Sequence, residues 1–460
     1  MNESLLRPPT FATPERQLPF FKALYTMLDN PMEGWPRAVF EDLVYIPPRR
    51  DFRTIFVCDP DILKTVLLDR VDEFPKSTIS QRLLTPMLGE GLLTAQIDNW
   101  KWQRRAAAPA FQHQSIARET PVIARVAAAA VERWRQGGSE IDASEEMMRI
   151  TFDVILETML GGRSMVDAPA LSRHFALYLK HLGKPSIADL MGAPDWVRQA
   201  LSPEGARAVR FMHEAIDAMI GKRRDAPPEG DLIDMLMDAR DTATGRAMSD
   251  RELRDNLITF LAAGHETTAL ALTWSLFLVS QHPDTEARIL AEVAAHAGEL
   301  AIDARIAQKL TFTRQVVQEA MRLYPPAPVL TRTSRRACIL GGHDVRAGDT
   351  IVIPIYALHR HRQHWRDPDC FDPDRFDAAQ GLDRRRFVFM PFGAGPRVCI
   401  GASFALHEAV IVLATILRAA NLQMRTTHAI RPLLRITMRP EGGLPMTLRF
   451  REPKQLPLAA

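Results

Sequence analysis

The stretch RFVFMPFGAGPRVCIG, Arg386 to Gly401, places one cysteine in a loop of glycine and proline directly before a long apolar run. The spacing F-x-x-G-x-R-x-C-x-G is formed by Phe392, Gly395, Arg397, Cys399 and Gly401. Glycine has no Cβ, so the three loop glycines, Gly393, Gly395 and Gly401, let the backbone pass close to a flat ligand or adopt a positive φ. An isolated cysteine is most often a buried structural residue. The surrounding pattern favours a ligand site here.

Two side chains of this loop carry recognisable chemistry. Cys399 precedes a predicted helix, ASFALHEAVIVLATILRAA, whose free amides and dipole would stabilise a thiolate. Arg397 can form bidentate hydrogen bonds to a carboxylate. The loop therefore predicts a thiolate next to a carboxylate-binding arginine.

On these residues the sequence resembles the cytochrome P-450 family of haem-thiolate monooxygenases, in particular its soluble bacterial members. The resemblance implies that Cys399 is the axial iron ligand of haem b, that Arg397 pairs with a haem propionate, and that Phe392 and Gly393 contact the haem. A thiolate ligand pushes electron density onto the iron and favours O–O cleavage. The resemblance also implies a mainly α fold with a small β region. We expect a single haem domain over residues 1–460, with residues 1–25 as an extended N-terminal segment.

A long central helix is predicted from Ser249, where SDRE provides a capping box, to the residue before Pro283. Its middle, FLAAGHETTALALTWSLFLV, is apolar on all sides, which predicts a buried helix. The alternative interpretation is that its polar residues form hydrogen bonds with one another inside a purely structural core helix.

Within this helix, Ala263 to Thr268 match the A-G-x-D/E-T-T signature of the family. The resemblance places Ala263 and Gly264 at the haem, with Gly264 reducing side-chain bulk where a ligand approaches. Thr267 can bond a carbonyl one turn earlier and loosen the helix. Glu266 and Thr267 would then form an acid–alcohol pair able to deliver protons to dioxygen.

A further family feature is E-x-x-R, matched by Glu319 and Arg322 in QEAMRLYPPAP. The spacing alone carries little information, because the chain repeats it at Glu132/Arg135, Glu146/Arg149 and Glu204/Arg207. The following Pro325-Pro326 and the arginine of FDPDRF, Arg375, distinguish this copy. We expect the three side chains to form a structural network that holds the cysteine loop.

Three other residues match propionate partners of the family. Trp100 and Arg104, in NWKWQRRAAAPAF, have the spacing W-x-x-x-R and share one helix face. Arg332, after YPPAPVL, occupies a position that is usually basic. For each of the three, the alternative to a propionate contact is an ordinary surface side chain whose apolar part packs against the protein while its polar end stays in water.

The remaining elements are predicted from local patterns. The runs LVYI, TIFV and TIVIPI predict strands near residues 43–46, 54–57 and 350–355. Residues 115–240 predict several amphipathic helices with a loop at 223–231. LRITMRPEGGLPMTLRF predicts a β-hairpin around Gly442-Gly443. Residues 73–99 and about 165–225 correspond to the variable substrate-contacting segments of the family.

Composition limits the possible partners and location. The net charge of +3 gives no support for a nucleic-acid partner. The four cysteines form no C-x-x-C pair, and the N-terminus is broken by prolines and charges. We therefore expect a soluble, cytoplasmic protein without a membrane anchor, and a monomer.

The redox partner and substrate are predicted only by class. The chain has no flavin or nicotinamide domain after the predicted haem core, so we expect electrons from NAD(P)H through a reductase and a ferredoxin or flavodoxin. DRRRF at residues 383–387, with Lys101 and Arg105, would present positive charge to an acidic partner, although a merely solvated basic face explains it nearly as well. Pro326–Leu330 and Leu261–Ala263 predict an apolar pocket wall and a hydrophobic substrate.

Three alternatives remain open at this stage. A haem-thiolate isomerase, dehydratase or peroxygenase would need no acid–alcohol pair, and a non-catalytic haem protein would bind ligands without oxygen-dependent turnover. The third alternative is a helical scaffold without haem. The presence of both Glu266 and Thr267 favours a monooxygenase over these.

Overall fold

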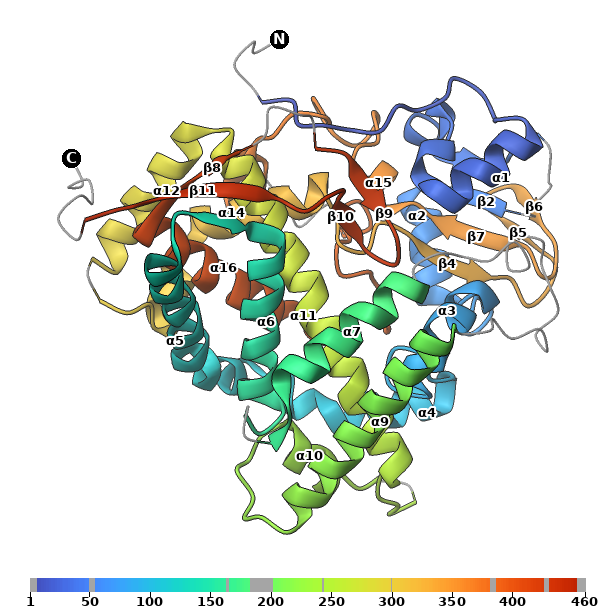
Figure 1. Ribbon diagram of the computed structural model, residues 1–460. Helices are drawn as coiled ribbons and strands as arrows, with labels where there is room; N and C mark the ends of the chain where they lie inside the picture. Colours follow the sequence, from blue (N-terminus) through green and yellow to red (C-terminus); the bar gives the residue numbers. More distant parts are fainter. Residues whose placement is uncertain are drawn as a thin grey trace.

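The structure is a computed structural model that describes residues 6–48, 54–162, 165–182, 202–241, 244–298, 300–380, 386–425 and 430–452. Helices form most of the molecule, and the small sheets lie at its margins (Figure 1). The predicted mainly α fold with a small β region is confirmed.

The helices follow the sequence pattern closely. In chain order they are α1 (Phe20–Asp29), α2 (Pro60–Lys64), α3 (Thr78–Leu88), α4 (Ile97–Ala107), α5 (His113–Gly137), α6 (Ala143–Met159), α7 (Ala168–Leu182), α9 (Pro203–Arg224), α10 (Leu232–Asp238), α11 (Asp250–Ser280), α12 (Pro283–His296), α13 (Ala304–Lys309), α14 (Thr311–Leu323), α15 (Ile355–Leu358) and α16 (Ala402–Ala419). A π-helical turn, Thr65–Asp69, directly follows α2. Residues 6–19 form no helix or strand, and α1 begins at Phe20, before the predicted end of the extended segment at residue 25.

The strands are short. They are β1 (Val44–Tyr45), β2 (Thr54–Val57), β3 (Glu140–Asp142), β4 (Leu330–Thr333), β5 (Cys338–Leu340), β6 (His343–Val345), β7 (Thr350–Ile353), β8 (Ala420–Met424), β9 (Pro432–Leu434), β10 (Met438–Pro440) and β11 (Pro445–Phe450). The largest sheet of the described chain has the order β1-β2-β7-β4, with β2 and β7 parallel and the other pairs antiparallel. The predicted strands β1, β2 and β7 are confirmed.

The predicted hairpin around Gly442-Gly443 is wrong. β10 pairs with β9, whereas β11 pairs with β3 and β8 in another sheet. Both glycines have positive φ, 79° and 82°, so the chain does turn there. The turn connects two sheets instead of two paired strands, because β10 pairs with the preceding β9, whereas β11 pairs with β8 and with the distant β3.

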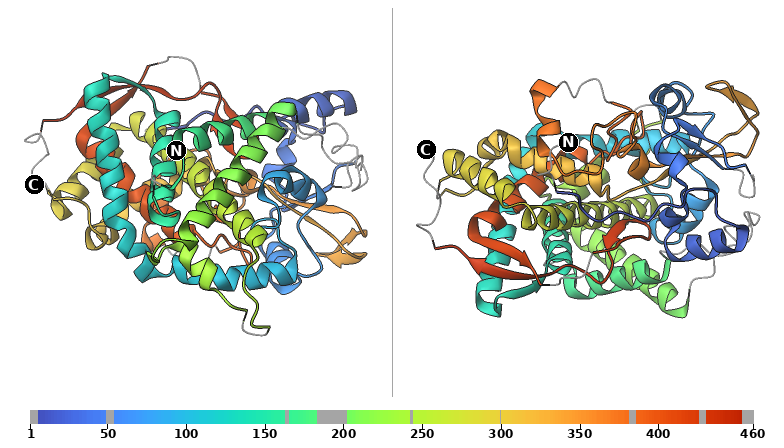
Figure 2. Two further views of the ribbon diagram at one scale, coloured as in Figure 1. Left: turned by 60° about the horizontal axis from the view of Figure 1, so that its bottom comes forward. Right: turned by 90° about the horizontal axis from the view of Figure 1, so that it is seen from above.

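Helix α11 crosses the middle of the helical body (Figure 2). The Ser249 capping box is present as predicted, with both of its reciprocal hydrogen bonds formed. Most of the helix is buried, and α6 packs closely along it. A Cβ on Gly264 would lie 2.8 Å from Cδ1 of Ile155 in α6. Gly264 therefore allows the close contact between α11 and α6, and its predicted place beside the haem stays a prediction.

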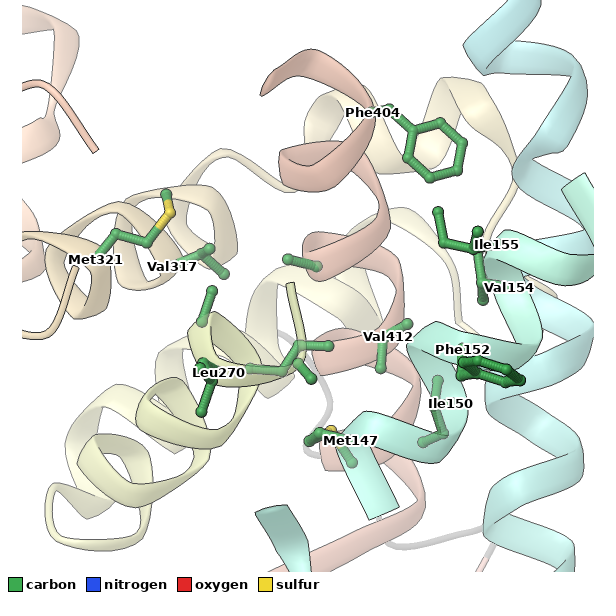
Figure 3. Close-up of a cluster of buried hydrophobic side chains, with 14 of the residues drawn as sticks. Met147, Ile150, Phe152, Val154, Ile155, Leu270, Val317, Met321, Phe404 and Val412 are labelled. Atoms are coloured by element: carbon green, nitrogen blue, oxygen red, sulfur yellow. The ribbon is translucent and has the colours of Figure 1, made fainter. Parts of the chain in front are cut away.

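The core that supports α11 comes from several helices. Figure 3 shows side chains of α6, α11, α14 and α16 meeting in one cluster. Its members include Phe152, Ile155, Leu270, Val317 and Val412, each at most 3% exposed. Within the described chain, α16 is the one helix long and apolar enough to cross a membrane, but 67% of that window is buried inside the protein. The packing of these four helices against one another positions α11 and also the cysteine loop that leads into α16.

Candidate functional site

The cysteine loop is held by its own backbone. The amide of Cys399 donates to the carbonyl of Phe392 at 2.9 Å, and the amide of Val398 donates to the carbonyl of Gly395 at 3.1 Å. Gly395 has a φ of 73°, and a Cβ there would lie only 1.9 Å from the carbonyl oxygen of Leu67 in the π-helical turn. Of the two roles predicted for the loop glycines, close passage to a flat ligand or a positive φ, Gly395 shows the positive φ. Its lack of a Cβ also allows close packing against the backbone of Leu67.

Gly401, just after the cysteine, is the N-cap residue of α16. The thiol of Cys399 retains exposed surface, yet the enclosing loop desolvates it enough to raise its pKa. The backbone amide of Gly401 and the positive charge of Arg104 act in the opposite direction and lower this pKa. The local field thus favours the thiolate, as the helix start predicts, while burial opposes it.

Four cations line one cavity of about 140 Å³ next to this loop. They are Lys76, Lys101, Arg332 and Arg397, and Trp100 lines the cavity with them. The guanidinium of Arg397 lies over the Trp100 ring, 4.6 Å from its centroid, and donates to the carbonyl of Ala95 at 3.2 and 3.3 Å. The structure therefore brings together three of the predicted carboxylate-binding residues and adds two lysines.

The chemistry of this set fits an anionic ligand. Burial lowers the pKa of Lys76 to about 7 and of Arg332 to about 10, and no carboxylate raises either pKa. Desolvation also lowers the pKa of Arg397, opposed by the exposed Asp72 at the same cavity. Buried positive charges without counterions are costly unless a ligand neutralises them. A group that carries two carboxylates would meet that need.

Lys76 was not identified from the sequence. It is one lysine in a variable segment and belongs to no motif. The structure places it by an isolated backbone bridge to Arg332, and its ammonium group donates to the carbonyl of Leu93. Only this pairing of segments that lie far apart in the sequence could reveal it.

Arg104 occupies a different place from the other cations. It shares a helix face with Trp100 on α4, as predicted, but it does not line the cavity of Lys76, Arg332 and Arg397. Its Nη1 donates to the carbonyl oxygen of Val398 at 2.6 Å. The W-x-x-x-R pair therefore contacts the cysteine loop at two separate points.

The acid and the alcohol of α11 have different hydrogen-bond partners. Glu266 is buried, and its Oε1 accepts from the hydroxyl of Thr437 at 2.6 Å and from the guanidinium of Arg439 on β10. The hydroxyl of Thr267 donates to the carbonyl of Ala263 at 2.7 Å. Thr437 and Arg439 were not identified from the sequence, because they reach Glu266 only through the β9–β10 hairpin.

The electrostatics of Glu266 are mixed. Burial raises the pKa of this carboxyl group, while Arg439 and Thr437 lower it. Ala263, one turn before Thr267, is exposed on a helix that is otherwise largely buried. This part of α11 thus has a small exposed surface at Ala263, with the hydroxyl of Thr267 and the carboxyl group of Glu266 on the next turn.

Comparisons with known proteins identify this arrangement. The sequence matches the Cytochrome P450 family over residues 50–444. The chain belongs to this family.

Its relatives cover several kingdoms. Cyclooctatin synthase of Streptomyces melanosporofaciens is 33% identical over 84% of this chain and 85% of its own length. Cytochrome P450 4F12 of Homo sapiens is 31% identical over 85% of this chain and 79% of its own length. The crystal structure of the cytochrome P450DA heme domain has a TM-score of 0.77 at 27% identity and covers 88% of both chains. The fold implies haem ligated by a cysteine thiolate. Relatives named as a synthase and as hydroxylases, such as the Taurochenodeoxycholic 6 alpha-hydroxylase of Sus scrofa, support a cytochrome P450 monooxygenase.

The E-x-x-R network of this cytochrome P450 is fully buried. Arg322 donates through Nε and Nη2 to the two carboxylate oxygens of Glu319 at 2.6 and 2.7 Å. It also bonds the carbonyls of His359, Pro368 and Cys370. Arg375 approaches Glu319 at 3.4 Å and bonds two further carbonyls. The predicted network of the three side chains is present.

A second, larger cavity of about 560 Å³ lies beside the cysteine loop of this cytochrome P450. Among the described residues none of its lining side chains is acidic, and its basic or polar ones are His113, Gln308, Arg314, Gln318, Arg386, Ser403 and His407. Residues 383–385 of the predicted docking patch lie outside the described chain. Of the described basic residues of that patch, Arg386 lines this larger cavity, Lys101 lines the smaller one, and Arg105 forms an ion pair with Asp241 at 3.3 Å. The basic surface at the larger cavity therefore shares Arg386 with the predicted patch.

Proposed function

We propose that this cytochrome P450 inserts one oxygen atom of O₂ into a hydrophobic organic substrate, with electrons from NAD(P)H delivered by a separate redox partner. The observation that carries the proposal is the pairing of two features in one fold. One is the Cys399 loop with its uncompensated cations, and the other is α11 with Glu266 and Thr267. The proposed domain is the whole chain, supported by one core cluster that extends from Phe11 to Leu448.

The loop residues would hold the cofactor. Haem b, bound through the thiolate of Cys399, supplies the oxidising chemistry when it is present. Lys76, Arg332 and Arg397 would neutralise its carboxylates, and Trp100 would support Arg397 by its ring. The carbonyl of Phe392 fixes the Cys399 amide and hence the direction of the sulfur.

Glu266 and Thr267 would manage protons. The Glu266 carboxyl group can hold a proton at Oε1 or Oε2, because burial raises its pKa. The Thr267 hydroxyl can exchange its bond with the Ala263 carbonyl for a bond to a reacting oxygen atom. An acid and an alcohol on neighbouring helix positions together form a path for proton delivery. Isomerases and peroxygenases do not need such a path, which favours the monooxygenase.

The substrate pocket would be apolar. Val329 and Ala262 are partly buried and pack against the main core, and Ala263, which follows Ala262 on α11, is exposed. Leu261, which was predicted as part of the pocket wall, is fully buried, and we leave it out of the proposed pocket. These short apolar side chains favour a hydrophobic substrate.

The larger cavity is the proposed docking site for an electron donor. Its lining contains Arg314, Arg386 and two histidines without an acidic residue among the described side chains. An acidic ferredoxin or flavodoxin would be attracted to this surface. A cytoplasmic monomer is proposed as well, checked by cell fractionation and sedimentation.

The main test is the variant Thr267→Ala in purified holoenzyme reconstituted with NADPH and a surrogate ferredoxin and reductase. A library of hydrophobic compounds is first screened for haem spin-state shifts to find a substrate. We expect Thr267→Ala to keep the red-shifted band of the reduced carbonyl complex but to divert NADPH into peroxide. The matched control is Thr273→Ala on the same helix, whose hydroxyl makes the same kind of bond, to Ala269 at 2.8 Å, inside the core.

Each outcome decides between the alternatives. Unaltered coupling in Thr267→Ala contradicts the proton path. Product formation that needs peroxide alone identifies a peroxygenase, and ligand binding without product at any electron supply identifies a non-catalytic haem protein. Protein without the red-shifted band after haem supplementation contradicts the proposal altogether.

A further inference from the structure

The hairpin of β9 and β10 carries the groups that bind Glu266. Thr437, in the turn of this hairpin, donates to Oε1 of Glu266 at 2.6 Å, and Arg439 on β10 donates to the same oxygen atom. Further along α11, Nε1 of Trp274 donates to the carbonyl of Met438 at 3.1 Å. The position of the hairpin relative to α11 therefore decides whether Glu266 keeps its partners.

The hairpin is a weak element by itself. β9 and β10 have three residues each and form a two-stranded sheet of their own. At its open end Pro432 is paired with Pro440, and neither proline has an amide hydrogen for the ladder. A two-stranded sheet is at best marginally stable in water, so contacts with other elements must hold it in place.

On the β9 side this contact comes from Asn30, which follows α1 and is fully buried. Its Nδ2 donates to the carbonyl of Pro432 at 3.1 Å, and its Oδ1 accepts from the amide of Leu434 at 3.2 Å. One side-chain amide thus provides the donor and the acceptor that a neighbouring strand would provide from its backbone. Asn30 extends the small sheet by one residue, although it lies 402 positions from Pro432 in the sequence.

Arg431, just before β9, adds ion pairs around this contact. Its guanidinium lies 2.9 Å from a carboxylate oxygen of Asp29, 2.8 Å from one of Glu33 and 3.2 Å from one of Glu441. The side chain of Arg431 is 35% exposed, so water and salt weaken these pairs. The buried bonds of Asn30 are not weakened in this way and form the firmer attachment of β9.

We propose, resting on the proton-delivery role proposed for Glu266, that Asn30 is a positioning residue for this acid. It acts through the hairpin, because by fixing β9 it keeps Thr437 and Arg439 on Glu266. Without the bonds of Asn30 the hairpin moves away from α11, and the side chain of Arg439, already 30% exposed, turns to the solvent. Glu266 is then a buried acid without a cation beside it.

The loss of Arg439 changes the charge of Glu266. Among the described residues, Arg439 is the charged group and Thr437 the polar group that act on this carboxyl group, and both lower its pKa, whereas burial raises it. The neighbouring His265 has its own pKa lowered to about 4 by burial, so it is uncharged at neutral pH. When the hairpin moves away, only the effect of burial remains, and the pKa of Glu266 rises further. Glu266 then keeps its proton to a higher pH and passes it less readily to Thr267.

The test measures the protonation of Glu266 in the holoprotein. The infrared band of the protonated Glu266 carboxyl group, identified by its loss in Glu266→Gln, is followed as a function of pH. Asn30→Leu removes both bonds to β9 and keeps a similar side-chain size. The matched control is Asn256→Leu, because Asn256 is also buried and its amide also bonds one carbonyl and one backbone amide, but these belong to Glu252 and Leu92 and not to the hairpin.

The expected results depend on the path through Arg439. Asn30→Leu should raise the pH midpoint of the band by about one unit, which is about a tenfold change in the proton dissociation constant. Asn256→Leu should leave the midpoint unchanged, and Arg439→Met should raise it at least as much as Asn30→Leu. The double variant Asn30→Leu/Arg439→Met should shift the midpoint by less than the sum of the two single variants, because both act on the same contact. An unchanged midpoint in Asn30→Leu, or additive shifts in the double variant, overturns the proposal.

Two further outcomes are also decisive. Should Asn30→Leu not fold with haem, the midpoint is read in Asn30→Ser, whose short side chain cannot reach both Pro432 and Leu434, and an unchanged midpoint there overturns the proposal as well. Full coupling of NADPH to product in Glu266→Gln refutes the proton-delivery role itself. That result is distinct, because the infrared midpoint of Asn30→Leu reports the positioning of Glu266 without any turnover.

Discussion

Replacement of Glu319 by glutamine should destabilise this cytochrome P450 strongly. Glu319 and Arg322 are both fully buried, and Arg322 makes five hydrogen bonds, two of them to the Glu319 carboxylate. Glu319 also accepts from the amide of Asp372 at 2.9 Å. In Glu319→Gln one carboxylate oxygen becomes an amide nitrogen that faces a donor, and the charge of Arg322 loses its counterion.

The size of the effect follows from this environment. Breaking a buried ion pair by removal of one partner costs about 3–5 kcal/mol, because the remaining charge stays desolvated. The three carbonyls bound to Arg322 do not replace the lost negative charge. A folded protein has a total stability of only about 5–15 kcal/mol, so the variant should lose a large part of it. The segment from Pro368 to Arg375, which the network holds, should loosen first.

The assay is urea unfolding of the holoprotein at a constant concentration of free haem. Soret absorbance and tryptophan fluorescence are followed together, because coincident transitions justify a two-state analysis. The control is Glu132→Gln, which has the same spacing to Arg135 but lies on the exposed surface of α5. We expect the control to change the free energy of unfolding by less than about 0.5 kcal/mol. A loss below about 1 kcal/mol in Glu319→Gln would show that the network is not the buried ion pair described above.

Three other predictions follow from the site. The affinity of the apoprotein for haem should be highest below pH 7 and should fall as the pH rises above 7. The pKa of Lys76 is lowered to about 7, and its side chain must be protonated to pair with a haem carboxylate. In haem titrations at several pH values, Lys76→Met should flatten this profile. Gly395→Ala should lose about 1–3 kcal/mol beyond Gly442→Ala, measured by urea unfolding, because both have positive φ but only the Cβ at 395 would meet a backbone oxygen, that of Leu67; equal losses would contradict the packing role. Arg386→Glu should slow the reduction of this protein by an acidic ferredoxin about tenfold at low salt, measured by stopped flow, and leave the reduced carbonyl spectrum unchanged. An unchanged rate of reduction would contradict the proposal that this surface is the docking site.

Local sequence patterns predicted a large part of the fold. The capping box at Ser249 and the apolar run behind it were enough to predict α11, and the helix after Cys399 was equally clear. These signals are local, because a capping hydrogen bond and a helical apolar face involve residues a few positions apart. The strand β3 was missed for the opposite reason. Its three residues become a strand only by pairing with β11 at the other end of the chain.

The site shows the same division. The spacing around Cys399 and the Glu266-Thr267 pair indicated thiolate and acid–alcohol chemistry from residue types alone. The motif predicts a place at the haem for Gly264, and the structure adds that its missing Cβ leaves room for Ile155 of α6, a contact that no local pattern shows. Arg104 was grouped with Arg397 and Arg332 as a propionate partner because of its W-x-x-x-R spacing from Trp100. The direction of its side chain separates it from them.

The sequence by itself determined the helices, the cysteine loop and the family, because each depends on residue types at short, fixed spacings. Apart from the network of Glu319, Arg322 and Arg375, only the tertiary structure decided which charges meet. Lys76 joins Arg332 through a backbone bridge, and Arg439 reaches Glu266 through a hairpin, across separations that no local pattern encodes. The desolvation that lowers the pKa of Lys76 and raises that of Glu266 likewise exists only after the chain has packed around them.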